Sequence, residues 1–307
     1  MALKLKIGTR SSPLALWQAE WVKAELLKTG RVESVELVKI KTSGDKILDV
    51  PLAKVGGKGL FTKEIEEALL RNEVDIAVHS MKDVPTQVPA GLEVKIITER
   101  ESPYDVLVSR GVPFASLPQN ARVGTSSLRR RSQLKRARPD LVIVDIRGNV
   151  QSRMKKMETE KLDAVILAAA GMIRLGYEKD ITEMLALSVC LPSVGQGALA
   201  IETRTNDPVV QELAHTTLHH QPSAWCVEAE RAFLRKLGGG CQVPIAGHCI
   251  LVDGVLRMEG LVCDLEGKRY FKEEASCEPA KGEEMGTALA EKLLRAGADK
   301  ILAELYC

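Results

Sequence analysis

The 307-residue sequence has few aromatic residues, no long apolar run and almost no net charge. Phe, Trp and Tyr make up 4% of the residues, whereas proteins that bind single-stranded nucleic acid need rings on which bases stack. Near the middle of the chain, the longest stretch without a charged or strongly polar residue is 164–173, which is short of the ~20 residues that span a bilayer. The formal net charge of +2 does not indicate a surface that binds polyanions as a whole. We therefore expect neither a nucleic-acid partner nor a membrane.

Signals for export, disulfide pairing and metal binding are also missing. The first residues alternate apolar and charged side chains and lack the apolar core of a signal peptide, so we expect a cytoplasmic protein. Seven cysteines are an odd number for a disulfide framework and are interpreted as thiols. Because no C-x-x-C pair and no H-E-x-x-H motif occurs, no metal site is expected.

The order of the predicted elements indicates the fold class. Short β-rich runs alternate with helical patterns through the first 220 residues, which is typical of α/β domains with parallel sheets. From Pro222 onward, one helix, three strand-like runs and a terminal helical stretch predict a small α+β domain with an antiparallel sheet. We expect domain 1 over 1–99 and 198–220, domain 2 over 104–192 and domain 3 over 221–307. The expected strands are 3–7, 35–40, 75–79, 92–97, 105–108, 122–124, 141–145, 164–167, 198–201, 245–252, 255–263 and 268–275.

A weak internal repeat predicts two similar α/β domains. The segment Ile7-Gly8-Thr9-Arg10-Ser11-Ser12 recurs as Val123-Gly124-Thr125-Ser126-Ser127, each time as a strand end, a Gly-Thr turn, serines and then a helix. In open α/β sheets, ligands bind beyond the carboxyl ends of the strands, where helix N-termini offer N–H groups to anions. Since both repeats would form such a site, one cleft between the two domains is the expected ligand site.

Basic residues are concentrated in one segment. Residues 122–156 hold eight Arg and three Lys against two Asp, a local excess of +9 in a chain whose remainder carries −7. They follow two consecutive predicted strands, so they should meet at one edge of the sheet, and Arg suits bidentate capture of carboxylate or phosphate. A small polyanionic ligand is therefore expected. A solvated basic helix face stays open as the alternative, above all for Lys135, Arg136 and Arg138.

The polar segment His79-Ser80-Met81-Lys82-Asp83-Val84-Pro85 follows an apolar strand and should lie at the same cleft mouth. A carboxylate there, flanked by Lys82 and His79, could handle protons or stabilise a cationic intermediate, although a turn-capping Asp is the alternative. The Gly-rich segment 56–59 lacks the Walker spacing, which favours a mobile lid over a P-loop.

Cys241 is the most unusual thiol, because three consecutive glycines precede it and allow its loop to approach a ligand closely. A buried inert thiol is the main alternative. A protease nucleophile is disfavoured, because His248 is only loosely placed as a base.

Five motifs together resemble the porphobilinogen deaminase (hydroxymethylbilane synthase) family. They are 10–19 (RSSPLALWQA), 79–85 (HSMKDVP), 124–130 (GTSSLRR), 147–150 (RGNV) and 239–244 (GGCQVP). Their order and spacing match from the N-terminus into the third domain. The resemblance implies two similar domains like those of type II periplasmic binding proteins around a cleft, plus a small α+β C-terminal domain. It also implies a monomeric transferase that condenses four porphobilinogen molecules into a linear tetrapyrrole with loss of ammonia.

The same resemblance implies the roles of individual residues. A dipyrromethane cofactor would be held by a thioether to Cys241, and Asp83 would be the catalytic carboxylate. The residues matched to cofactor binding are Lys82, Ser80, Thr125, Ser126, Ser127, Arg129 and Arg130. Those matched to substrate binding are Arg10, Ser12, Arg147, Arg153 and Arg174. A non-enzymatic anion-binding module of the solute-receptor type remains the alternative, and it would need no thiol at position 241.

Overall fold

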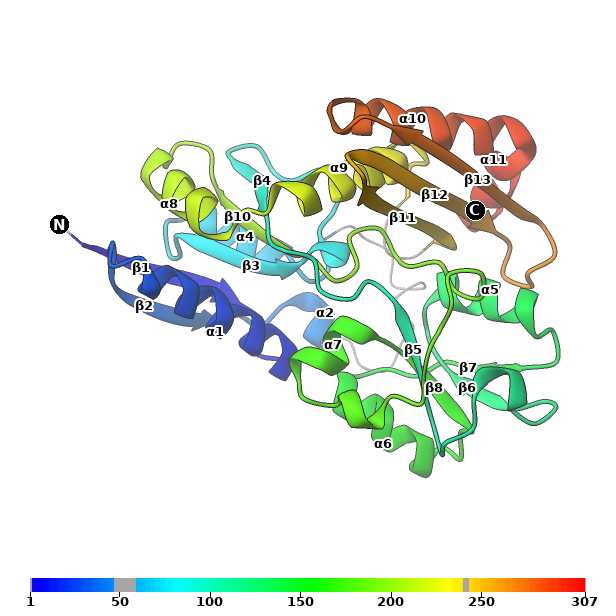
Figure 1. Cartoon of the computed structure of the whole chain (residues 1–307). Helices are drawn as coiled ribbons and strands as arrows, with labels where there is room; N and C mark the ends of the chain where they lie inside the picture. Colours follow the sequence, from blue (N-terminus) through cyan, green and yellow to red (C-terminus); the bar gives the residue numbers. More distant parts are fainter. Residues whose placement is uncertain (1, 47–58, 240–242, 307) are drawn as a thin grey trace. The chain divides into compact units, whose positions relative to one another are not determined.

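The computed structural model describes residues 2–46, 59–239 and 243–306, and the chain divides into two compact units (Figure 1). Unit 1 takes in the N-terminal part as far as Glu101 and then Ala198–Ala224. Unit 2 takes in Ser102–Gly197 and the chain from Trp225 to the C-terminus. Along the described residues, the chain therefore passes between the units three times.

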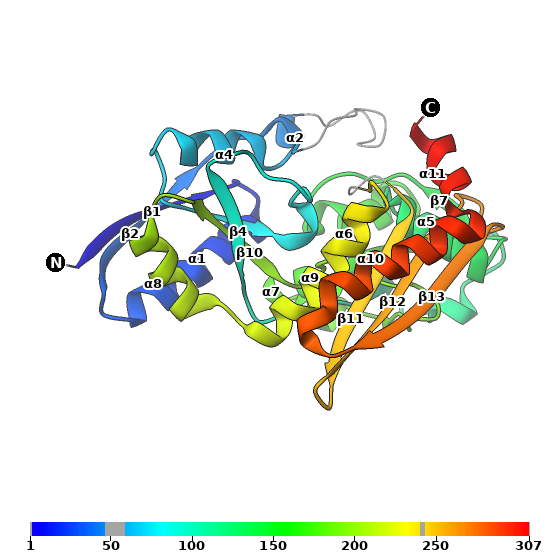
Figure 2. The same cartoon turned by 90° about the horizontal axis from the view of Figure 1, so that it is seen from above.

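Unit 1 is built on a five-stranded sheet with helices on both faces. In spatial order its strands are β2 (Val32–Lys39), β1 (Leu3–Thr9), β3 (Ile76–Ser80), β10 (Leu199–Arg204) and β4 (Leu92–Ile97). Its helices are α1 (Pro13–Lys28), α2 (Ser43–Lys46), α4 (Lys63–Leu70) and α8 (Pro208–Leu218), with a 3-10 turn η1 (Met81–Asp83). Apolar residues of α1 and α8 pack on one face of the sheet and those of α4 on the other (Figure 2).

Unit 2 begins with a second five-stranded sheet. In spatial order its strands are β7 (Val142–Val144), β6 (Arg122–Gly124), β8 (Ala164–Ala168), β5 (Asp105–Ser109) and β9 (Glu183–Met184). Its helices are α5 (Leu128–Ala137), α6 (Val150–Thr159) and α7 (Ala169–Arg174), with 3-10 turns η2 (Phe114–Ser116) and η3 (Glu178–Asp180). Alternate residues of the central strands point to opposite faces, so Val165 packs with α6 and α7 while Ile166 packs with α5.

The two sheets have the same plan, which confirms the predicted pair of similar α/β domains. In each, the strand that ends in Gly-Thr lies second, and one strand runs antiparallel to its neighbours. That reversed strand is β10 in unit 1 and β5 in unit 2, each the first strand after the chain enters that unit. The expectation of parallel layers is therefore wrong for these two strands.

The repeated glycines have one physical reason. A Cβ atom on Gly124 would lie 2.8 Å from Leu162 Cδ1 and 2.9 Å from Ile146 Cδ1, and one on Gly8 would lie 3.1 Å from Ile65 Cγ2. Both strand ends thus pack so closely against neighbouring side chains that a larger residue would displace them.

The C-terminal part of unit 2 is the predicted small α+β domain. Its antiparallel strands are β11 (Ile245–Val252), β12 (Val255–Cys263) and β13 (Tyr270–Cys277). Its other elements are α9 (Gln221–Lys236), the 3-10 turn η4 (Pro279–Lys281), α10 (Gly282–Leu293), a π-helical turn η5 (Leu294–Ala298) and α11 (Asp299–Tyr306). Side chains of α9, α10 and α11 form one core with β11 and β12, among them Phe233, Leu289 and Met258.

The expected strands match the structure closely, with one addition. The two-residue strand β9 was not expected, since Glu183 and Met184 have no apolar alternation. The division into three domains with boundaries at 99, 104, 192, 198 and 220 stays a prediction. Expected domain 2 (104–192) and expected domain 3 from Trp225 onward belong to one compact unit.

Candidate functional site

Asp83 lies at the end of η1, directly after β3 of unit 1. The amide of Met81 donates to the carbonyl of Ala198 at 3.0 Å, and Gln18 of α1 donates to the Ser80 hydroxyl at 2.9 Å. These bonds fix the turn on the sheet. The Asp83 side chain is half-buried, and within the described part of the chain its carboxylate has no hydrogen-bond partner. It can therefore accept hydrogen bonds from a ligand.

The first Gly-Thr turn brings Arg10 and Ser12 to the same edge of this sheet, because β1 and β3 are parallel and in register there. The Ser12 hydroxyl accepts from the Ala15 amide at 3.3 Å and caps α1, whose first residue is Pro13. Ser12 thus has a structural role in addition to its predicted contact with substrate.

Arg10 is held by two groups that the sequence did not reveal. Its Nε lies 3.2 Å from Asp45 Oδ1, and its guanidinium carbon lies 4.1 Å from the centre of the Phe61 ring. Burial alone would raise the pKa of Asp45, but the hydrogen bonds from Arg10 and Thr42 and the charge of Arg10 together outweigh it and bring that pKa below its usual value. The guanidinium is therefore oriented by a carboxylate with which substrate carboxylates would compete.

The second Gly-Thr turn repeats this arrangement in unit 2. Ser127 caps α5 by accepting from the Arg130 amide at 3.4 Å, and the Ser126 hydroxyl donates to the Ile146 carbonyl at 2.6 Å. The Thr125 hydroxyl accepts from the Ser127 amide at 3.2 Å. The turn that carries the three predicted hydroxyls is thus fixed by its own hydrogen bonds.

Arg129 and Arg130 lie side by side on α5 and are both buried around Asp105. Arg130 Nη2 donates to Asp105 Oδ1 at 2.7 Å, and Arg129 Nη1 donates to Oδ2 at 2.6 Å. Arg130 Nη1 also donates to the Ile166 carbonyl at 2.9 Å, and Arg129 Nη1 to the Leu191 carbonyl at 2.7 Å. One carboxylate thus faces two guanidinium groups, which leaves one positive charge in excess.

The surroundings of Asp105 complete this cluster. Gln196 Nε2 donates to it at 2.9 Å and the Cys190 thiol at 3.2 Å. Burial by itself raises the pKa of Asp105, but the charges of the two arginines outweigh it and hold that pKa well below its usual range. Burial and the neighbouring Asp105 charge raise the pKa of Cys190 to about 12, so Cys190 is an inert thiol.

The three remaining predicted arginines are half-buried residues of unit 2. Arg147 follows β7 by three residues, and Arg153 lies on α6, where its Nε donates to the Gly148 carbonyl at 2.8 Å. Arg174 ends α7 and donates from Nη2 to the Gly197 carbonyl at 2.6 Å. Since β6, β7 and β8 are parallel, the turns after them share one edge of the sheet.

His79 differs from its expected position. It was predicted to flank Asp83 at the cleft mouth, but its ring is buried and Nε2 lies 3.0 Å from Glu202 Oε2. The reason is the period of two along β3, which puts His79 and Ser80 on opposite faces. Lys82 and Asp83 remain on the turn that follows.

Cys241 and residues 56–58 lie outside the described residues, so the predicted cofactor attachment and lid are not tested.

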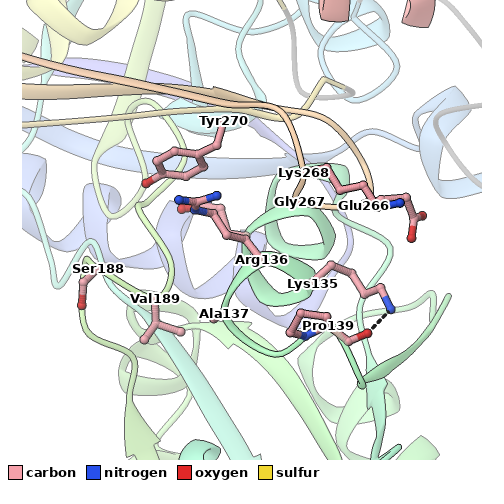
Figure 3. A pocket seen from close by; sticks show the side chains of 11 residues that line it. Lys135, Arg136, Ala137, Pro139, Ser188, Val189, Glu266, Gly267, Lys268 and Tyr270 are labelled. Carbon is pink, nitrogen blue, oxygen red and sulfur yellow. Dashed lines mark hydrogen bonds between the residues drawn. The ribbon is translucent and has the colours of Figure 1, made fainter.

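A cavity of about 500 Å³ in unit 2 contains none of the predicted site residues. It lies where the β12–β13 turn meets α5, with the Tyr270 ring lying over the Arg136 guanidinium (Figure 3). Lys135 reaches the Pro139 carbonyl at its edge. Lys135 and Arg136 therefore line this cavity.

In the described part of the chain, no three His, Cys, Asp or Glu side chains are arranged to hold a metal ion. No helix found there is long and apolar enough to cross a bilayer.

Two family models match the chain. "Porphobilinogen deaminase, dipyromethane cofactor binding domain" matches residues 5–212, and "Porphobilinogen deaminase, C-terminal domain" matches residues 224–295. Among similar curated proteins, the porphobilinogen deaminase of Geobacter sulfurreducens is 57% identical over 307 residues, covering 100% of this chain and 96% of that protein. That of Geobacter metallireducens is 56% identical over 303 residues, covering 99% and 95%.

Solved structures with a similar fold include a TRAP periplasmic solute binding protein from Desulfovibrio salexigens. It is 10% identical with a TM-score of 0.44, over 73% of this chain and 75% of that one. Another is a probable amino-acid ABC transporter extracellular-binding protein from Bacillus subtilis, 12% identical with a TM-score of 0.44, over 71% and 90%. These likenesses concern the fold alone.

Proposed function

The chain belongs to the porphobilinogen deaminase family, and on that premise we propose that it deaminates four porphobilinogen molecules and joins them head to tail into the linear tetrapyrrole hydroxymethylbilane. It is a transferase of tetrapyrrole biosynthesis. The observation that carries this conclusion is the match of relatives named porphobilinogen deaminase along the whole chain, at 57% identity over 307 residues.

The described residues suit a dipyrromethane cofactor, whose rings carry acetate and propionate groups. Unit 2 offers one excess positive charge at Arg129, Arg130 and Asp105, and the capped N-terminus of α5 beside them favours anions. The residues proposed to hold the cofactor are Lys82, Ser80, Thr125, Ser126, Ser127, Arg129 and Arg130, with a thioether to Cys241. When bound, the cofactor supplies the pyrrole carbon to which the first substrate unit is joined.

The two arginines of α5 are not equivalent in this role. The Nε and Nη2 atoms of Arg130 both donate to Asp105, and its Nη1 donates to Ile166, so all three nitrogens are in use. Among the described residues, the side-chain hydrogen bonds of Arg129 all start from Nη1. Arg129 is therefore the better candidate for direct contact with a cofactor carboxylate, and Arg130 for keeping its neighbour in place.

Asp83 is the proposed catalytic carboxylate. Loss of ammonia from the aminomethyl group of porphobilinogen leaves a cation, and a half-buried carboxylate stabilises such a charge more strongly than water does. Asp83 can also accept pyrrole N–H groups and take up a proton as the new carbon–carbon bond forms. Its freedom from other hydrogen bonds among the described residues supports this role.

Substrate carboxylates are proposed to bind Arg10, Arg147, Arg153 and Arg174, with Ser12 as a further donor. The guanidinium of Arg10 is already oriented by Asp45 and Phe61, which reduces the entropy lost when a substrate carboxylate binds. We also propose that the protein acts in the cytoplasm as a monomer without nucleic acid.

The test is turnover of purified protein with porphobilinogen, followed by mass spectrometry of the product and an ammonia assay. One linear tetrapyrrole and four ammonia molecules should appear for every four porphobilinogen molecules consumed. Asp83→Asn is the matched variant, which should bind substrate and turn it over far more slowly. Binding of porphobilinogen without any ammonia release would contradict the proposal and favour the receptor alternative.

A further inference from the structure

Three ionisable side chains are buried together on the face of the unit 1 sheet that α4 covers. His79 Nε2 lies 3.0 Å from Glu202 Oε2, and the two side chains are 4% and 1% exposed. Glu66 of α4 is 6% exposed. The same face also holds an apolar cluster that includes Ile65, Leu69 and Leu92.

Such a pair is not explained by stability. Replacing a buried ion pair by apolar residues of similar volume is often neutral or stabilising, because both charges must give up their hydration. Glu202 Oε1 is also buried and has no hydrogen-bond partner within the described residues. The pair therefore calls for a reason other than the cohesion of the core.

The charged groups nearest to the pair bond other partners. Arg204, the next residue on this face of β10, is committed to Asp75 and Asp207. Glu64 of α4 accepts hydrogen bonds from Ser43 instead. His79 is thus the side chain that bonds Glu202 in the described structure.

The His79–Glu202 bond lies near the end of the β3–β10 ladder. Residue 79 is opposite Ala200 and residue 202 is opposite Ala77, so the bond crosses the β3–β10 ladder diagonally. The ladder ends one residue later at Ser80, and the Met81 amide then donates to Ala198. The bond therefore clamps the end of β3 just before the turn that carries Lys82 and Asp83.

We propose that the His79–Glu202 pair is a positioning device that holds the end of β3 on β10 and so fixes the Asp83 carboxylate against the reacting substrate. Its importance for turnover rests on the proposed function of Asp83. Neither His79 nor Glu202 touches substrate in this account. A small displacement of a catalytic group is sufficient for a large effect, since about 1 Å can cost a factor of ~10² in rate.

The decisive variant is His79→Leu combined with Glu202→Met, because it removes both polar partners at once and leaves neither of them buried without the other. We expect this double variant to keep its cofactor and its thermal stability. Its kcat should fall at least about tenfold with KM changed less than about twofold, and amide exchange at Met81 should become faster. Glu202→Gln can still bond His79, so it should retain most of the kcat.

Arg204→Met is the matched control, since it breaks a buried ionic contact on the same strand away from the turn. It should lower thermal stability and leave kcat per folded molecule unchanged. A double variant with wild-type kcat and unchanged Met81 exchange would overturn the inference. If Asp83→Asn is fully active as well, the proposed function of Asp83 has failed. If Asp83→Asn is inactive, only the positioning role has failed, and the Met81 exchange reports on that role independently of turnover.

Discussion

Asp105 offers the sharpest test of how unit 2 is held together. Its carboxylate is fully buried and accepts hydrogen bonds from Arg129 at 2.6 Å and from Arg130 at 2.7 Å. The substitution Asp105→Asn keeps the shape of the side chain and removes its charge. Two buried guanidinium groups would then remain without a counter-ion in the described part of unit 2.

The expected magnitude follows from the burial of all three groups. Breaking a buried ion pair by removing one partner costs about 3–5 kcal/mol, because the other charge stays desolvated. In a unit of this size, about 1 kcal/mol corresponds to a shift of roughly 2–4 °C in Tm. Asp105→Asn should therefore lower the Tm of unit 2 by about 6–20 °C. Because Arg129 loses its fixed partner, the variant should also be purified with less cofactor.

The assay is differential scanning calorimetry with cofactor content determined by intact mass. Asp140→Asn is the control, since Asp140 forms a pair with Arg138 that is only partly buried, and the loss of that pair should change Tm much less. The folded-state pKa of Asp105 is depressed, so its stabilisation is present above the unfolded pKa of about 4 and is lost as the pH falls through the folded value. The difference between wild type and variant should thus persist at neutral pH and narrow only in acid. A Tm within about 2 °C of wild type at pH 7 would refute the reasoning.

Three further predictions concern individual residues. Asp83→Asn should lower kcat by roughly 10² or more with little change in Tm, and near-normal turnover in steady-state kinetics would contradict its catalytic role. Arg130→Leu should be purified largely without cofactor and with a lower Tm, whereas Arg10→Leu should keep its cofactor and stall during elongation; normal cofactor in both would argue against this division. Burial, and to a smaller extent the charge of Glu202, raises the pKa of Glu66 in the folded protein. Protonated Glu66 therefore stabilises unit 1 below the pKa of the unfolded state, and this stabilisation is lost as the pH rises through the pKa of the folded state. Glu66→Gln should therefore gain Tm relative to wild type as the pH rises above the usual glutamate pKa of about 4.5, and a Tm difference independent of pH would speak against it.

Local sequence signals predicted most of the fold. The Gly-Thr repeat, the capping serines and the apolar alternation are short-range features, and they lie in the structure where their patterns indicated. The direction of β5 and β10 could not be predicted in the same way. Each is the first strand after the chain passes from one unit to the other. The alternation of apolar residues that predicts a strand does not depend on the direction in which the strand runs.

The residues that bond the candidate site residues could not be predicted from the sequence either. Arg129 and Arg130 stand out by charge, but Asp105 precedes Arg129 by 24 positions and lies on another element. Glu202 is 123 positions from His79, and nothing near His79 indicates that α4 would cover its face of the sheet. Such contacts depend on how distant segments pack, so a single sequence carries no local signal for them.

The proposed attachment of a dipyrromethane cofactor to Cys241 is tested most directly by the intact mass of the purified native protein and of its Cys241→Ser variant. We predict that the native chain carries the mass of two porphobilinogen units less two ammonia molecules. That addition should be absent from Cys241→Ser and retained in Cys226→Ser and Cys263→Ser, whose thiols are buried. An active native protein at its bare polypeptide mass would contradict the account.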